Sequence, residues 1–512
     1  MPDEATADLI FASDQANHNF ARVLGDLRRS HLSITHRLRS IGRDAAFVAD
    51  VAAHYPGFPV VANERCGSWY VPPAQKGGSA YFKSTDGHTG QWKFSLRRLN
   101  LHLLSLMREA SLSLAGGGGG GGGCVIVDST RRGKRMPDAL SKTIPLWCCV
   151  LNRARFPDDA EVHTLYTPPG VVSASEHSQM LARVPGFVDG LLGLGVLASE
   201  DNNDKKNNHN QKPLRPVWVT PDMPWPDVSG LRDRFDVILC CTSSRVPASD
   251  GEAEGTGDYI QGAADDTENW AHGLTPELFW ANYEQLLDTP EADLPALIET
   301  LVAAAEATSA ADKASTEAPG SVTWSDTSIT PYLAAGQWTG AAPLVLPPSD
   351  VASASVCHVV FVRQTTDAAT WARSPTCLEV GLGKQDKIAG RTLRYALPQI
   401  CDFVAAFLER VVGVGETSEK TETKKARPLP MIRVLCPTGR DISVGTALAL
   451  LCFCFDETGA PRTASAAAQP PGIINKDVIR VRLARIMAAM PHANPSRATL
   501  QSVNSFLMDY RG

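Results

Sequence analysis

Apolar residues in the first half of the chain follow two kinds of spacing, and each kind predicts a different element. Residues 32–55 and 94–110 carry apolar side chains at every third or fourth position, which predicts two amphipathic helices. Residues 124–130 and 235–241 instead contain continuous apolar runs, which predict buried strands. A further helix is expected with Thr275 as its N-cap. Because strands alternate with helices, this half predicts an α/β fold.

The second half of the chain repeats this alternation. Apolar runs predict two strands, at residues 355–362 and 431–436. Helical spacing predicts four helices, at residues 397–412, 443–455, 476–487 and 498–510. The second half therefore predicts another α/β domain.

Segments of low complexity interrupt these patterns. They are a glycine run at 116–123, a polar tract at 201–212, an Ala/Ser/Thr-rich stretch at 303–320 and a charged stretch at 415–428. Such compositions bury too little apolar surface to offset the loss of chain entropy, so they predict loops or linkers. We expect a first domain over 1–305 with insertions at 115–123 and 199–213, a linker over 306–345 and a second domain over 346–512.

Composition narrows the class of protein. The chain has 512 residues, a formal net charge of -6 and 43% hydrophobic residues, as in ordinary globular proteins. It has no apolar run of about 20 residues and no basic-then-apolar leader, so neither a membrane partner nor secretion is expected. The 12 cysteines lie mainly in apolar contexts without a CxxC pair, which favours reduced thiols and a cytoplasmic location. The acidic balance argues against DNA as a partner.

Cations are nevertheless concentrated in residues 79–98 and 124–147. Basic side chains among Gly, Ser and Thr are typical of sites that bind phosphorylated substrates. The candidate cations are Lys83, Arg131, Arg132, Lys134 and Arg135. A solvated surface, or contacts to the phosphates of a nucleic acid, would need the same residues.

Residues 431–451 join a buried strand to a helix through a Gly-containing turn, an arrangement that binds anions through free backbone N–H groups. This turn resembles the loop of dual-specificity phosphatases, which runs Cys, five residues, Arg, Ser. The matching positions are Cys436, Gly439 and Ser443, the last expected to cap the helix. Ile442 stands in place of the arginine, so phosphate binding through a pattern with Arg440 and Asp441 is expected, and phosphatase activity is not. The alternative is that the loop is only a turn.

Longer stretches resemble one family throughout. The stretches are residues 64–72, 81–104, 127–153, 259–280 and the phosphatase-like tail. Together they resemble the initiator-tRNA phosphoribosyltransferase family. The resemblance implies an N-terminal α/β transferase domain followed by a dual-specificity-phosphatase-like α/β domain. It also implies transfer of a 5-phosphoribosyl group from phosphoribosyl pyrophosphate to the 2'-hydroxyl of the adenosine at T-stem position 64 of initiator tRNA, which excludes that tRNA from elongation.

This chemistry assigns roles to the candidate residues. Displacement of pyrophosphate needs cations and usually Mg²⁺, and the acceptor hydroxyl needs a base. The five cations are expected to hold phosphate, and Asp128, at a strand end, is expected to bind the metal or a ribose hydroxyl. Asp86 and His88, in a Gly-flanked turn, are the expected base and its partner.

Each assignment has an alternative. Asp86 and Asp128 would also suit turn caps, and His88 a structural role. A second acidic cluster, formed by Asp265, Asp266 and Glu268, would suit either a metal or the start of a helix. For the whole chain, the alternatives are a noncatalytic tRNA-binding protein and an active phosphatase that uses Cys436.

Overall fold

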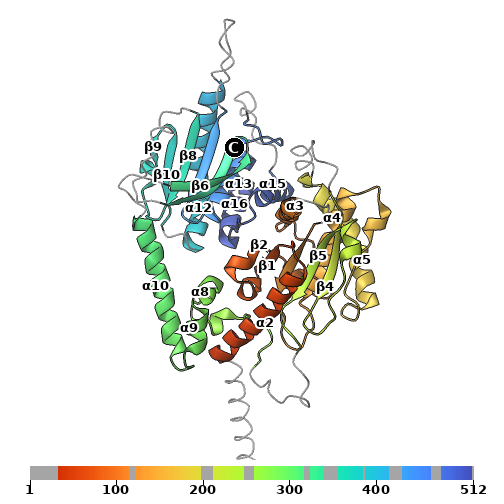
Figure 1. The fold of residues 1–512 in the computed structure, drawn as a ribbon. Coiled ribbons are helices and arrows are strands. Elements are labelled where there is room, and N and C mark those ends of the chain that lie inside the picture. The colour runs from red at the N-terminus through yellow and green to blue at the C-terminus, as the bar shows by residue number, and fades with distance from the viewer. Residues whose placement is uncertain are drawn as a thin grey trace, which may run out of the picture. The chain divides into compact units, whose positions relative to one another are not determined.

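The computed structural model describes most of the chain in two compact units. The described ranges are 33–114, 122–197, 211–246, 259–315, 323–339, 355–383, 387–413, 429–462 and 474–509. The first unit comprises Met1–Phe94, Leu103–Asp189 and Asn207–Thr308, and the second comprises Ser95–His102, Gly190–Lys206 and Ser309–Gly512. Each unit contains a sheet with helices packed beside it, so both are α/β, as predicted (Figure 1).

The first unit contains a five-stranded, fully parallel sheet. Its strands are β1 (Val60–Asn63), β2 (Lys76–Ala80), β3 (Gly123–Asp128), β4 (Leu214–Val219) and β5 (Asp236–Thr242). Their order in the sheet is β2-β1-β3-β5-β4. The chain passes from β1 to β2 on one side and then to β3 on the other, so the strand order reverses between β1 and β3. Ligands of open parallel sheets bind outside the carboxyl ends of the strands at such a point.

Two of the helices predicted in this half, over 32–55 and after Thr275, are present, but most of the other helices of the first unit were not predicted. The longer helices of the unit are α2 (Ile34–His54), α3 (His102–Leu114), α4 (Ile144–Arg155), α5 (Ala174–Leu192) and α10 (Leu294–Ser315). The shorter ones are α7 (Ser229–Arg232), α8 (Pro276–Ala281) and α9 (Tyr283–Asp288). Thr275 caps α8 as predicted, because its side chain accepts a hydrogen bond from the Leu278 N–H. The helix Leu294–Ser315 also extends into the stretch 303–320, so the prediction of a loop or linker is wrong for that part.

The helix predicted over 94–110 begins only at His102, so its first half is wrong. Asn100 has a φ of 52°, which interrupts a right-handed helix. The segment Ser95–His102 belongs to the second unit instead. There the Arg98 guanidinium donates to the Ala493 carbonyl at 2.8 Å and to Asn494 Oδ1 at 2.6 Å.

The second unit contains a six-stranded mixed sheet in the order β6-β7-β11-β8-β10-β9. Its strands are β6 (Thr323–Thr330), β7 (Leu333–Thr339), β8 (Val356–Val362), β9 (Ala372–Ser374), β10 (Cys377–Gly381) and β11 (Met431–Cys436). The strands β6 and β7 lie inside the range 306–345 that the sequence assigned to a linker. The second sheet therefore begins before residue 346.

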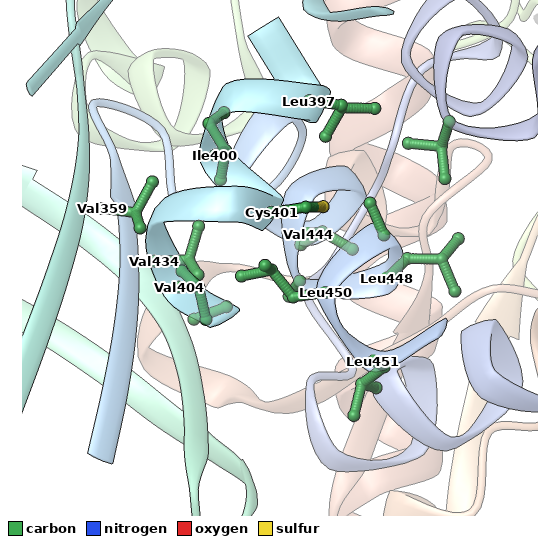
Figure 2. Packing of buried hydrophobic residues seen from close by; sticks show 14 of the residues in the cluster. Val359, Leu397, Ile400, Cys401, Val404, Val434, Val444, Leu448, Leu450 and Leu451 are labelled. Atoms are coloured by element: carbon green, nitrogen blue, oxygen red, sulfur yellow. The ribbon is translucent and has the colours of Figure 1, made fainter. Parts of the chain in front are cut away.

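Of the described helices, α12 (Lys387–Gly413), α13 (Ile442–Cys454) and α15 (Lys476–Ala489) contact this sheet, and α16 (Arg497–Asp509) packs on α12 and α13. Helix α13 is apolar on every side and buried along nearly its whole length, so it forms the centre of the core. Figure 2 shows Val444 and Leu448 of α13 near Cys401 of α12. Among the described helices, none is long and apolar enough to cross a membrane.

Two remaining predictions concern insertions and thiols. Most of the predicted insertions at 115–123 and 199–213 lies outside the described residues, although β3 already begins at Gly123. All 12 cysteines are buried and free. Burial raises the pKa of several of these thiols, for example Cys377 to about 11, which makes them unreactive near neutral pH.

Candidate active site

The carboxyl edge of the first sheet gathers polar residues at the point where the strand order reverses. Asp128 is the last residue of β3 and pairs in register with Thr242 at the end of β5. Asn63 ends the neighbouring strand β1, and Arg65 follows two residues later. The Asp128 side chain is 0% exposed, so its charge must be balanced by its protein neighbours.

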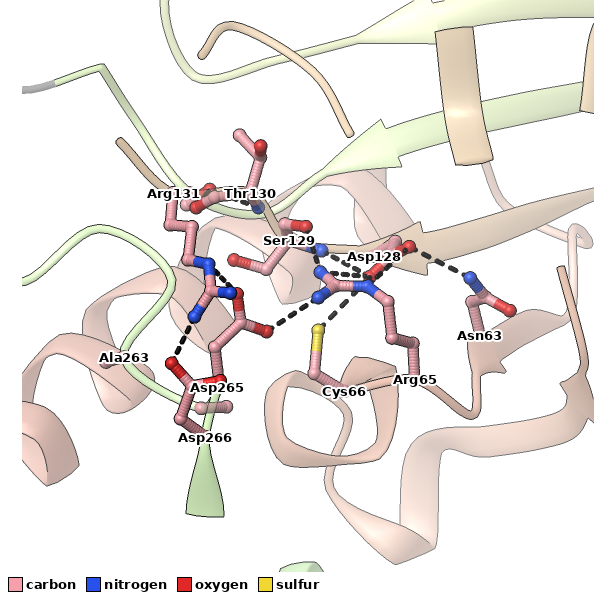
Figure 3. A network of polar contacts seen from close by, with 12 residues as sticks. Asn63, Arg65, Cys66, Asp128, Ser129, Thr130, Arg131, Ala263, Asp265 and Asp266 are labelled. Atoms are coloured by element: carbon pink, nitrogen blue, oxygen red, sulfur yellow. Dashed lines mark hydrogen bonds and ion pairs between the residues drawn. The ribbon is translucent and has the colours of Figure 1, made fainter. Parts of the chain in front are cut away.

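Asp128 accepts hydrogen bonds from four residues (Figure 3). Its Oδ1 accepts hydrogen bonds from Arg65 Nη2 at 3.1 Å, from the Cys66 thiol at 3.1 Å and from the Ser129 N–H at 2.8 Å. Its Oδ2 accepts a hydrogen bond from Asn63 Nδ2 at 2.9 Å. These bonds fix the carboxylate and join the ends of β1 and β3.

Arg65 and Arg131 share the acidic residues of the loop that precedes α8 (Figure 3). Asp265 lies between the two guanidinium groups, 2.7 Å from Arg65 Nη1 and 3.5 Å from Arg131 Nε, and Asp266 also bonds Arg131. Burial by itself would lower the pKa of Arg65, but Asp128 and Asp265 outweigh it and raise that pKa. Burial raises the pKa of Asp265 in spite of the two arginines. Charges therefore alternate along this edge of the sheet.

The basic residues after Arg131 form an exposed loop. Arg132, Lys134 and Arg135 are exposed, and within the described residues only Lys134 of these three forms an ion pair, at 3.2 Å from Asp138. The loop is held by the Gly133 N–H, which donates to Gln261 Oε1 at 2.8 Å. Two exposed guanidinium groups on an anchored loop are available to bind an anion.

The loop over residues 259–266 must pass very close to this basic loop. Gly262 has a φ of +69°, and a Cβ at this position would lie 2.8 Å from the Thr130 carbonyl oxygen. Only glycine tolerates both the backbone conformation and the approach. Gly262 therefore allows the acidic and basic loops to pack together.

The turn that carries Asp86 and His88 lies at the same edge of the sheet. Asn63 connects them, because its side chain bonds Asp128 and also both backbone groups of Phe82. Asp86 lies in the short 3-10 helix Ser84–Gly87, and burial raises the pKa of its carboxyl. Within the described residues its carboxylate forms no hydrogen bond or ion pair, whereas His88 lies 3.8 Å from Asp138. The structure thus brings the predicted residues together but does not pair Asp86 with His88.

The described residues do not fit a metal site built by the protein. Asp128 directs its oxygens at the four donors named above, so a metal would have to displace Arg65. Asp265 and Asp266 are paired with arginines, and Glu268 lies in the 3-10 helix Thr267–Asn269. No group of three or more His, Cys, Asp or Glu side chains in the described ranges is arranged to hold a metal ion.

The phosphatase-like loop of the second unit keeps its central thiol. Cys436 ends β11, its thiol donates to Ser443 Oγ at 3.1 Å, and it accepts from the Gly439 N–H at 3.2 Å. Gly439 has a φ of +64°, which suits the tight turn. Ile442 is 1% exposed and belongs to the hydrophobic core, so it presents no donor to a phosphate.

The prediction that Ser443 caps α13 is wrong. The cap is Asp441, and Ser443 lies inside the first turn, where its hydroxyl accepts the bond from Cys436. Asp441 Oδ1 accepts the Ser496 N–H at 2.8 Å, and the Arg440 carbonyl accepts the Asn494 N–H at 2.8 Å. The Arg440 side chain is exposed. The loop is therefore anchored by its backbone and by Asp441, with one exposed cation.

Sequence reasoning missed Arg65 as the counter-charge of Asp128. The signal was present, because Arg65 follows a short apolar strand, and the carboxyl ends of parallel strands meet at one edge. It also missed Asp138 and Glu176, which lie near His88 through contacts between separate segments. No local pattern reveals such contacts.

Comparison with known proteins identifies two matching domain models. Residues 27–303 match the Rit1 N-terminal domain, and residues 376–507 match the Rit1 DUSP-like domain. A Saccharomyces cerevisiae protein described as a tRNA A64-2'-O-ribosylphosphate transferase is 32% identical over 96% of this chain and 95% of its own. An uncharacterised Schizosaccharomyces pombe protein is 34% identical over 95% of this chain and 97% of its own. No solved structure matches the chain.

Proposed function

This chain belongs to the Rit1 family, and on that premise we propose that it transfers a 5-phosphoribosyl group from phosphoribosyl pyrophosphate to the 2'-hydroxyl of adenosine 64 in initiator tRNA. The observation that carries the proposal is the placement of the basic loop 131–135 three residues after Asp128, at the carboxyl edge of a parallel sheet where the strand order reverses. A phosphate-bearing ligand fits this place. The modified tRNA would be excluded from elongation.

In this proposal, the donor binds through the cations of the first unit. Arg132 and Arg135 meet the pyrophosphate, since neither forms an ion pair among the described residues. Lys134, in the same loop, and Lys83, which precedes the 3-10 helix Ser84–Gly87, supply further positive charge. One guanidinium group can donate two parallel hydrogen bonds to phosphate oxygens, and it stabilises the negative charge that develops on the departing pyrophosphate. Mg²⁺, which we expect the reaction to require, would then accompany the donor and not Asp128.

Arg131 has a different place in the proposal. It is tied to Asp265 and Asp266, so it supports the loop and contributes less free charge to the donor. Asp128, bonded to Arg65, holds the strand ends in register. His88, half-exposed at the same edge, is the base for the acceptor hydroxyl.

The loop 436–443 is proposed to bind a phosphate of the donor or of the tRNA. Its anchored backbone and the exposed Arg440 support this role. Phosphatase activity is disfavoured, because Ile442 is buried in the core and the thiol of Cys436 lacks an arginine partner at that position. A noncatalytic tRNA-binding protein would not need the buried ionic framework around Asp128.

The test is transfer from phosphoribosyl pyrophosphate labelled in its ribose. Purified protein is incubated with initiator tRNA and, separately, with elongator tRNA, with and without a chelator. The proposal predicts label in initiator tRNA only, lost when the chelator removes Mg²⁺. Tight tRNA binding without label would favour the noncatalytic alternative, and release of inorganic phosphate without transfer would favour a phosphatase.

A further inference from the structure

His88 belongs to a ring of polar side chains that closes on itself. Its Nε2 lies 3.8 Å from Asp138 Oδ2, and Asp138 Oδ1 lies 3.2 Å from Lys142 Nζ. Lys142 Nζ is 2.7 Å from Glu176 Oε1, which also accepts the Thr89 hydroxyl at 2.9 Å. Because Thr89 follows His88 in sequence, the ring returns to its starting point.

The members of the ring differ sharply in exposure. The side chain of Lys142 is 8% exposed, and those of Asp138 and Glu176 are each 13% exposed, whereas that of His88 is 53% exposed. Burial would raise the pKa of Glu176, but its bonds from Lys142 and Thr89 outweigh it and lower that pKa. The buried members of the ring thus form a fixed ionic network, and the His88 imidazole extends from it into solvent.

Backbone packing fixes the position of His88 relative to Asp138. A Cβ at Gly87 would lie 2.6 Å from the Asp138 carbonyl oxygen, so the two backbones are in direct contact. Thr143 Oγ1 donates to the Lys83 carbonyl at 3.0 Å and joins the same two segments. Lys142 and Thr143 lie in a five-residue π-helix, Ala139–Thr143, that leads into α4. Such turns are rare and are frequent at functional sites.

Resting on the proposed function, we propose that Asp138 is the positioning residue that orients His88 as the general base, and that Lys142 and Glu176 hold Asp138 in place. Asp138 Oδ2 lies 3.8 Å from Nε2, too far for a direct hydrogen bond, so Asp138 acts on the imidazole through its charge. With Nε2 facing Asp138, Nδ1 is the proposed atom that takes the acceptor proton. This assignment replaces the expected pairing of His88 with Asp86.

The reaction step balances on this arrangement. The 2'-hydroxyl proton moves to His88 Nδ1 as the 2'-oxygen bonds to the anomeric carbon of the donor. The bond from that carbon to the pyrophosphate oxygen breaks, and its electron pair leaves with the pyrophosphate. Asp138 stabilises the imidazolium until it releases the proton to water.

The charges around His88 determine what removal of Asp138 does. The charged groups on its own segment and on the segments packed against it are Lys83, Asp86, Lys93, Lys134, Asp138, Lys142, Glu176 and Arg183. Asp138 is the anion in contact with the imidazole. Its loss leaves an excess of cations, so the variant stabilises less well the imidazolium that forms when His88 takes the 2'-hydroxyl proton.

The experiment compares pH–rate profiles of labelled transfer for the full-length wild type, Asp138→Asn and Asp138→Glu. We expect the rate of Asp138→Asn to fall about 10- to 100-fold, with the midpoint of the acidic limb moved to lower pH. Asp138→Glu keeps the charge and should recover part of the rate with the limb near its wild-type position. Asp189→Asn, an exposed carboxylate on the same helix as Glu176, is the matched control and should behave as wild type.

Each outcome decides one question. A wild type that transfers no label refutes the proposed function. A wild type that transfers label while Asp138→Asn keeps its rate, or loses rate without moving the limb, overturns the role of Asp138. If Asp138→Asn does not fold by thermal melting, His88→Gln decides, because it leaves the buried ring intact. It should remove the acidic limb, and an unchanged limb would overturn the proposal.

Discussion

Removal of the Arg65 guanidinium should destabilise the first unit, because it leaves the Asp128 carboxylate buried without a counter-charge. In Arg65→Ala, Asp128 loses donors at 3.1 and 3.2 Å and keeps the Asn63 amide, the Cys66 thiol and the Ser129 N–H. Loss of one partner from a buried ion pair costs about 3–5 kcal/mol. Because the Arg65 side chain is 30% exposed, solvent screening reduces the expected loss to about 2–3 kcal/mol.

Thermal unfolding of the full chain, followed by circular dichroism, measures this loss. For a unit of this size, about 1 kcal/mol lowers the melting temperature by about 2–4 °C, so a shift of about 5–10 °C is expected. The double variant Arg65→Ala/Asp128→Asn removes the uncompensated charge at residue 128, and it should recover part of the loss, since Asp265 still lacks its partner Arg65. Arg39→Ala, an exposed arginine on α2, is the control and should change stability by less than about 0.5 kcal/mol.

Two results would refute this reasoning. One is a melting temperature of Arg65→Ala that equals that of Arg39→Ala. The other is a double variant whose loss is the sum of the two single losses, since additivity would mean that the two side chains do not interact.

Three further predictions concern pH, the phosphatase-like loop and its thiol. Burial raises the pKa of Asp44 well above its ordinary value despite a hydrogen bond from Tyr259, so the folded state holds this proton more tightly than the unfolded state. The free energy of unfolding therefore falls as pH rises from the ordinary Asp range towards the pKa of Asp44 in the folded state. Asp44→Asn should melt at a higher temperature than wild type at alkaline pH, and the difference should shrink on acidification. An equal difference at all pH values would contradict this. Arg440→Glu should lower transfer more than tenfold without changing the melting temperature, because a like charge would face the bound phosphate; unchanged donor affinity and turnover would make the loop only a turn. Wild-type protein should not hydrolyse aryl phosphates, and hydrolysis that Cys436→Ser abolishes would show the opposite.

The sequence predicted those elements whose side chains are nearly all buried. The strands β3 and β11 are buried along most of their length, and both end in a polar turn. The interior of β3 is a continuous apolar run, and β11 is apolar except for Arg433. The strand β2, KGGSA, has neither alternation nor an apolar run, because its neighbours and not its own side chains determine it. The helix predicted from Phe94 failed for a related reason, since the bonds of Arg98 to Ala493 and Asn494 come from distant segments.

The residues of the candidate site also fall into those that the sequence identified and those that it did not. Asp128 and the basic loop were identified because a strand end and a run of cations are visible locally. The partners Arg65, Asp138 and Glu176 were not, because each meets its partner across separate segments of the fold. Spacing in the sequence indicates which residues carry charge, but the register of parallel strands determines which of those charges meet.

The most direct test of the proposed function uses initiator tRNA that differs from the natural acceptor by one atom. A tRNA with 2'-deoxyadenosine at position 64 is compared with the unmodified tRNA, using ribose-labelled phosphoribosyl pyrophosphate and wild-type protein. We predict that label enters the unmodified tRNA and is absent from the deoxy substrate, because the acceptor oxygen is missing. Equal labelling of the two substrates would contradict the proposed acceptor and the general-base role of His88 together.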